Sequence, residues 1–195
     1  MQKVRSSTLA ELGVHHSRSR RATHDLAVVL HALGEANAAA GLWRSVRAAA
    51  DLGGDDRVSV SALCGLATVE LEHAASLGPG PERAVSLLRA SRAVQDAHAA
   101  ALRSLGPTDL LTLTTKYDVA LSWLYREMGE RSKGVLRELD AALLQLPATD
   151  EGVALHARVT GTARGIARVE GAFHVAVAAP LVVAVACVCI ALASC

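Results

Sequence analysis

Apolar residues recur along the chain at the spacing of a single helix face. Between residues 18 and 33 the apolar positions Leu26, Val29, Leu30 and Leu33 follow the i, i+3, i+4, i+7 spacing of an amphipathic helix. Glycines and prolines interrupt the pattern at intervals. The pattern predicts helices over residues 18–33, 35–52, 58–77, 82–105, 109–128, 130–146 and 149–170. We interpret consecutive helices as helical hairpins.

The hairpins carry an internal repeat. A Leu-Gly pair occurs three times, and an apolar residue followed by Ala comes fourteen residues after each of its leucines. The pairs are Leu12-Gly13 with Leu26-Ala27, Leu52-Gly53 with Leu66-Ala67, and Leu105-Gly106 with Val119-Ala120. One offset found three times indicates repeats of a single structural unit.

The intervals between these repeats are unequal. The first two begin forty residues apart, and the next interval is fifty-three. Residues 77–82 hold two prolines and two glycines, which cannot continue a helix. We therefore expect a long loop there to explain much of the difference, with Pro81 as the first residue of the next helix. Thr108 or Asp109 is expected to cap the helix after Pro107.

A fourth unit begins near Leu146, and its first helix is rich in glycine. The fourteen-residue offset falls there on Thr160-Gly161, so the unit is a decayed repeat or a cap. The sequence thus predicts a lead-in over residues 1–17, three hairpins over 18–146, a decayed fourth repeat over 147–171 and an apolar segment over 172–195.

These repeats resemble tetratricopeptide repeats of the kinesin light chain type, whose units open with Leu-Gly-Pro-x-His-Pro-x-Thr-Leu-x-Thr. The best match is residues 105–116, LGPTDLLTLTTK. The resemblance covers about residues 8–146. In the first repeat the positions that the family uses for packing are Leu26, Ala27, Leu30, Gly34, Ala39 and Trp43. The resemblance implies an all-α fold, a short α-α superhelix of antiparallel helix pairs, that binds other proteins.

The chain departs from the family at two points. Asp25, Gly65 and Asp118 stand where the family has an Asn that lines its binding groove. Two extra residues between Ala120 and Gly129 suggest a bulge or a register shift in the first helix of the third repeat.

The resemblance also implies a binding groove lined by the first helix of each pair. Its candidate residues are Arg21, His24, Val28 and His31 in the first repeat, Ser61, Cys64, Thr68 and Leu71 in the second, and Thr114, Tyr117, Leu121 and Leu124 in the third. Such a mixed surface suits an extended or helical peptide with apolar anchors. The alternative for Leu71, Leu121 and Leu124 is that they pack between repeats.

The C-terminal segment has no Asp, Glu, Lys or Arg between residues 171 and 195. As a helix, residues 172–195 would span about 36 Å, against a hydrocarbon core of about 30 Å. Arg158, Arg164 and Arg168 precede it, which is typical of an anchor whose N-terminal side stays in the cytosol. The alternatives are a final helix buried on the fourth unit and a strand-like terminus.

Composition and net charge exclude several classes of fold and function. Ala, Leu and Val dominate, and only five residues are aromatic, which favours helices packed through small side chains. Twenty basic and nineteen acidic residues give a net charge of +1, which does not suggest a nucleic-acid partner. The four cysteines lack CxxC spacing, so neither zinc nor a disulfide framework is indicated. No spacing in the sequence defines a metal site from His15, His16 and His24, so we expect no metal there.

No phosphate-binding loop, HExxH helix or GxSxG elbow is present in the sequence. Side-chain pairs such as Glu72 with His73 and Asp96 with His98 are common on helix surfaces. We therefore expect no enzyme and no cofactor. The leading hypothesis is an adaptor that binds a protein or peptide; the alternative is a regulatory or oligomerisation domain. The charged N-terminus lacks the apolar core of a signal peptide. It predicts a cytoplasmic protein, attached to a membrane if residues 172–195 form an anchor.

Overall fold

The computed structural model describes residues 17–50 and 57–169, and its regular structure there is helical. The helices are α2 (Ser17–Ala32), α3 (Ala36–Ala50), α4 (Arg57–Ser76), α5 (Pro81–Leu105), α6 (Leu110–Tyr125) and α7 (Gly129–Leu143), followed by a helix over residues 150–169. Residues 1–16 and 172–195, which include the lead-in and the apolar segment, lie outside the described residues. Among the described residues, no helix is long and apolar enough to cross a membrane.

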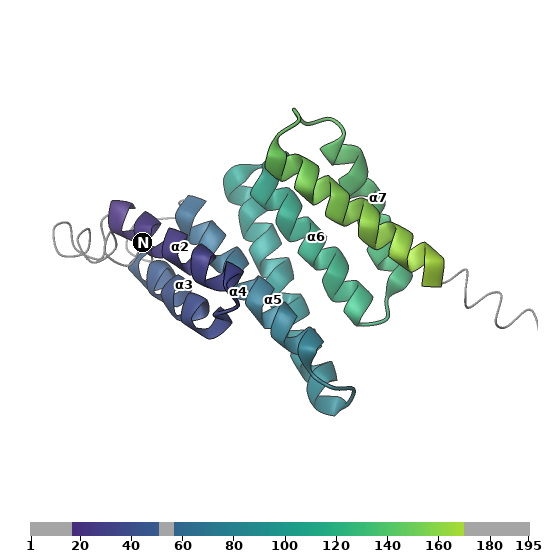
Figure 1. Cartoon of the computed structure of the whole chain (residues 1–195), viewed down its shortest axis with the longest axis horizontal. Coiled ribbons are helices and arrows are strands. Elements are labelled where there is room, and N and C mark those ends of the chain that lie inside the picture. Colours follow the sequence, from purple (N-terminus) through teal and green to yellow (C-terminus); the bar gives the residue numbers. More distant parts are fainter. Residues whose placement is uncertain (1–16, 51–56, 170–195) are drawn as a thin grey trace, which may run out of the picture.

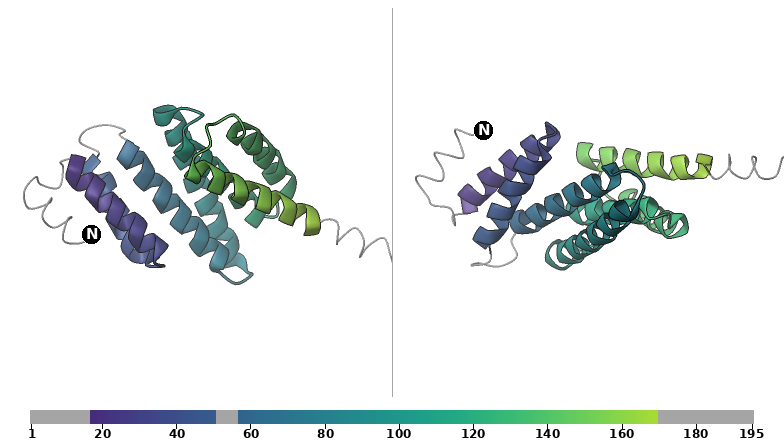
Figure 2. Two further views of the ribbon diagram at one scale, coloured as in Figure 1. Left: turned by 45° about the horizontal axis from the view of Figure 1, so that its top comes forward. Right: turned by 90° about the horizontal axis from the view of Figure 1, so that it is seen from below.

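Consecutive helices run antiparallel and stack as pairs, α2 with α3, α4 with α5 and α6 with α7 (Figures 1 and 2). The first helices of neighbouring pairs also touch, because α2 contacts α4 and α4 contacts α6. These three helices therefore share one face of the molecule, which we call the inner face. The arrangement confirms the predicted all-α superhelix of helix pairs.

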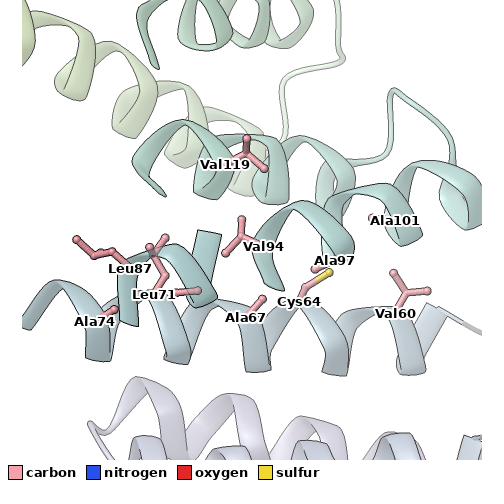
Figure 3. Close-up of a cluster of buried hydrophobic side chains, with 11 residues drawn as sticks. Val60, Cys64, Ala67, Leu71, Ala74, Leu87, Val94, Ala97, Ala101 and Val119 are labelled. Atoms are coloured by element: carbon pink, nitrogen blue, oxygen red, sulfur yellow. The ribbon is translucent and has the colours of Figure 1, made fainter. Parts of the chain in front are cut away.

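The core of each helix pair contains one alanine of the internal repeat, which comes fifteen residues after the leucine of the Leu-Gly motif. We call it the repeat alanine. Ala27, Ala67 and Ala120 are 0%, 3% and 0% exposed. Each belongs to the apolar cluster that includes the second helix of its own pair. Figure 3 shows Ala67 on α4 facing Val94 of α5, and Leu71 and Ala74 of α4 beside Leu87 of α5. A small side chain at this position lets the two helix backbones approach closely, which explains why the repeat pattern includes it.

The long interval in the repeat comes from longer helices rather than from a long loop. Only residues 77–80 connect α4 to α5, and Pro81 begins α5 as predicted. The two helices contain 20 and 25 residues, whereas α2 and α3 contain 16 and 15. The predicted helix ends were therefore correct to within one residue, but the explanation of the long interval by a long loop was wrong. The α4–α5 hairpin extends beyond its neighbours at the bottom of Figure 1.

The predicted bulge in the third repeat is absent. Both α2 and α6 end five residues after the repeat alanine, and both α3 and α7 begin nine residues after it. Gly129 is the first residue of α7, so it does not correspond to Gly34 in the first turn. The residue that does correspond is Glu127, with φ of 60° where Gly34 has 84°. The prediction failed because it aligned two glycines that have different roles.

The helix over residues 150–169 packs against α6 and α7. Leu155, Val159 and Ile166 are buried in one cluster with Leu136 and Leu139 of α7. The fourth unit thus closes the C-terminal side of the third pair.

At the start of α6, Asp109 caps the helix as expected, accepting a hydrogen bond from the Leu111 backbone N–H at 2.9 Å.

Candidate binding face

A cavity of about 190 Å³ lies on the inner face, where α2, α4 and α6 meet. Its lining residues are His24, Val28 and His31 of α2, Trp43 of α3, Ser61, Cys64, Gly65 and Thr68 of α4, and Leu111, Thr114, Thr115 and Asp118 of α6. Pockets for small molecules usually measure about 300–1,000 Å³. This cavity is smaller and suits a single side chain of a larger partner.

Side-chain hydrogen bonds join the three helices across this face. His24 Nε2 lies 2.8 Å from Ser61 Oγ, which connects α2 with α4. Thr68 Oγ1 lies 2.9 Å from a carboxyl oxygen of Asp118, which connects α4 with α6. A second link between α2 and α4 joins His31 Nε2 to Glu72 at 2.8 Å. Polar contacts therefore fix the relative positions of the lining residues.

Burial controls the charge of the groups around the cavity. It raises the pKa of Asp118 to about 6, although the hydrogen bond from Thr68 and the nearby Arg158 oppose the change. Burial lowers the pKa of His24, against the opposing effect of Asp25. Burial, with Asp118 nearby, raises the pKa of the Cys64 thiol to about 12. At neutral pH the His24 imidazole and the Cys64 thiol are uncharged. The raised pKa of Asp118 brings its carboxyl closer to neutrality than an ordinary aspartate.

Trp43 reaches the cavity from α3 because Gly65 leaves room for its ring. A Cβ atom at Gly65 would lie 2.7 Å from the buried indole. The imidazole of His31 stands over the same ring system, with centroids 5.6 Å apart and planes tilted by 57°. An aromatic floor under the cavity thus depends on one glycine in the middle of α4.

Seven of the twelve proposed groove residues line the cavity. They are His24, Val28, His31, Ser61, Cys64, Thr68 and Thr114. Arg21 is exposed on α2 but is not part of the lining. Leu71 is 3% exposed, in the core of the second pair.

The other groove candidates pack against the fourth unit. Tyr117 is 5% exposed, and its hydroxyl lies 2.9 Å from Thr162 Oγ1. The guanidinium of Arg158 lies 4.7 Å from the centre of the same ring. Leu121 and Leu124 are partly buried against the cluster that includes the last helix. These side chains face a neighbouring helix, because the fourth unit covers this part of α6.

The sequence did not identify five of the lining residues as such: Trp43, Gly65, Leu111, Thr115 and Asp118. Two of them had a usable signal, because Gly65 and Asp118 occupy the position of the groove-lining Asn in the resembled family. No sequence signal pointed to Trp43, because it lies on α3, the second helix of its pair. It reaches the inner face only where Gly65 leaves space in α4.

The side-chain pairs considered for catalysis have structural partners instead. Glu72 bonds to His31, and His98 Nδ1 lies 3.2 Å from Thr115 Oγ1 between α5 and α6. Over residues 17–50 and 57–169, no group of three or more His, Cys, Asp or Glu side chains is placed to hold a metal ion. His15 and His16 lie outside these ranges.

No protein-family model and no curated protein matches the sequence. The structure, however, is similar to a crystal structure of Podospora anserina putative kinesin light chain nearly identical TPR-like repeats. The similarity covers 90% of this chain and 84% of that chain, with a TM-score of 0.57 and 13% sequence identity. The chain has the TPR-like fold. The comparison thereby confirms, at the level of fold, the resemblance that the Leu-Gly repeats indicated.

Proposed function

We propose that this TPR-like chain is a protein–protein interaction scaffold that binds a segment of a partner protein on its inner face. The observation that supports this function is the meeting of seven groove candidates from α2, α4 and α6 around one cavity. Repeat solenoids present such shared faces to extended ligands, since each helix pair adds one strip of surface.

The chemistry of the face favours a neutral anchor on the partner. Val28 is 46% exposed at the edge of the cavity and offers apolar contact. The hydroxyls of Ser61, Thr68 and Thr114 and the neutral imidazole of His24 surround it. A peptide with one apolar or small polar side chain for the cavity, and backbone groups for the hydroxyls, fits this surface best.

One arrangement on the face looks like catalytic machinery. His24 lies between Ser61 at 2.8 Å and Asp25 at 3.5 Å, the order of groups in a Ser-His-Asp triad. Ser61 lies in the interior of α4, however, where backbone N–H groups bond to carbonyls one turn earlier. Such N–H groups are not free to stabilise an oxyanion, which hydrolysis by a serine requires. This supports binding rather than catalysis.

A displayed random peptide library, selected on the full chain, tests the proposal. Val28→Glu places a charge at the cavity, and Val85→Glu is its matched control on α5, where Val85 is 69% exposed. We expect Val28→Glu to weaken the binding of selected peptides at least tenfold and Val85→Glu to leave their affinity unchanged. Equal affinity for both variants, or failure to select any peptide, would contradict the proposal.

A further inference from the structure

A larger cavity lies between α7 and the helix over residues 150–169, and we call it the terminal groove. Its volume is about 600 Å³, within the range of about 300–1,000 Å³ that is usual for small-molecule pockets. Its lining residues are Glu130, Lys133, Leu136, Arg137 and Asp140 of α7, and Val159, Thr160, Ala163, Arg164 and Ala167 of the last helix. None of these residues lines the cavity on the inner face, so the terminal groove is a separate candidate site.

The floor of the terminal groove is apolar. Leu136 and Val159 are each 1% exposed, and they pack in one cluster from the two helices that form the groove. Ala163 and Ala167 are exposed beside them, and side chains as small as these leave the space above the floor open. At the rise of an α-helix, α7 borders the groove for about 15 Å between Glu130 and Asp140. A narrow apolar body fits this floor.

The two acidic side chains of the groove already have partners. Lys133 Nζ lies 2.9 Å from a carboxyl oxygen of Glu130, and this hydrogen bond lowers the pKa of Glu130, with a smaller effect from Arg137. At the other end of the groove, Asp140 lies 2.8 Å from His156 Nε2 of the last helix. The carboxylates therefore stand at the two ends of the α7 wall, each beside a basic group.

Two arginines lie between these ends, Arg137 on α7 and Arg164 on the last helix. Both are exposed. Arg137 donates to the backbone carbonyl of Lys133 at 3.4 Å, and within residues 17–50 and 57–169 neither guanidinium forms an ion pair. Guanidinium groups bind carboxylates through parallel, charge-assisted hydrogen bonds. The middle of the groove thus offers two cationic groups beside an apolar floor.

We propose that the terminal groove binds a small amphipathic anion, a carboxylate that carries an unbranched apolar chain. The carboxylate binds Arg137 and Arg164, and the chain lies along Leu136 and Val159. A neutral chain of the same length gains only the apolar contact and therefore binds less tightly. The site does not depend on partner binding at the inner face.

Calorimetric titration of the full chain with decanoate, below its micelle concentration, tests the proposal. We expect saturable binding at one site with a Kd below about 1 mM. Decan-1-ol, the neutral counterpart, should bind about tenfold more weakly or worse, because it forms no charge-assisted hydrogen bond. Absence of saturable decanoate binding, or equal affinity for the acid and the alcohol, would contradict the proposal.

Substitutions in the groove locate the site. Arg137→Gln and Arg164→Gln should each weaken decanoate binding about tenfold. Arg89→Gln, on the exposed surface of α5, is the matched control and should leave the affinity unchanged. Ala163→Phe fills the groove and should abolish binding, while its circular dichroism spectrum and Tm stay close to those of the unmodified chain, since Ala163 is exposed. Affinity that none of these groove variants changes would place decanoate elsewhere and overturn the proposal.

The same variants distinguish the other occupants. If decanoate does not bind and Ala163→Phe dissociates a dimer in sedimentation, the groove belongs to a second copy of the chain. If decanoate does not bind and Ala163→Phe weakens the peptides selected on the full chain, the groove belongs to a protein partner. Either result overturns the proposal. Val28→Glu should leave decanoate binding unchanged, so the terminal groove and the inner face are tested separately.

Discussion

The carboxyl of Asp118 makes the stability of the α4–α6 contact depend on pH. Asp118 is 5% exposed and shares the Thr68 hydroxyl with the carbonyl of Cys64, to which Thr68 also donates at 3.0 Å. The hydrogen bond from Thr68 and the nearby Arg158 favour the ionised carboxylate, whereas burial favours the neutral acid and has the larger effect.

The magnitude follows from the pKa. Burial raises the pKa of Asp118 from 3.8 to about 6. A tenfold change in an ionisation constant corresponds to about 1.4 kcal/mol, so ionising Asp118 in the folded chain costs about 3 kcal/mol. The folded-state pKa is above the unfolded one, so this contribution to stability is complete below about pH 4. It is lost as the pH rises through about 6.

Replacing the carboxyl with an amide removes this dependence. We expect Asp118→Asn to have a higher free energy of unfolding than the unmodified chain at pH 8, by about 2 kcal/mol, since the amide oxygen still accepts from Thr68. At pH 4.5 most of the advantage should be gone. Urea unfolding at pH 4.5, 6 and 8 measures the difference, and Asp96→Asn on the exposed surface of α5 is the control. A difference that does not change with pH, or one that grows towards low pH, would refute the reasoning.

Three further predictions concern the turn, the aromatic floor and the serine. Glu127→Gly should raise the free energy of unfolding by about 1 kcal/mol in urea unfolding, because glycine adopts the positive φ of this turn without strain; an unchanged value would contradict the turn assignment. Gly65→Ala should lower it by about 1 kcal/mol despite the gain in helix propensity, because the added methyl meets the Trp43 ring, whereas Gly41→Ala should raise it. With p-nitrophenyl acetate, the full chain and its Ser61→Ala variant should hydrolyse the ester equally slowly, and a rate that depends on Ser61 would contradict the expectation that the chain is not an enzyme.

The sequence predicted the fold well where one residue decides the packing. The repeat alanines could be found from their fixed offset, because close contact between paired helices requires a small side chain at that point. The turn after α6 could not be placed correctly, since Glu127 adopts a conformation that a sequence pattern assigns to glycine. The ends of the α4 and α5 helices were predicted to within one residue, because the prolines and glycines of residues 77–82 mark the break between them. What was wrong was the explanation of the long repeat interval, which comes from the length of these helices and not from the loop.

The candidate site was predictable where the first helices alone create it. His24, Ser61 and Thr68 line the cavity because the repeat spacing places them on the inner face. Tyr117 does not, because the helix over residues 150–169 packs on it, and no spacing within the third repeat reveals that neighbour. Trp43 lines the cavity because Gly65 leaves space for its ring. A sequence pattern does not show that α3 and α4 bring these two residues together.

The central claim, that the inner face binds the partner segment, is tested most directly by mapping a selected peptide onto the full chain by NMR. We predict that its amide chemical-shift changes concentrate in residues 21–31 of α2, 61–68 of α4 and 111–118 of α6. Changes concentrated on α3, α5 and α7, with the inner face unaffected, would contradict the account.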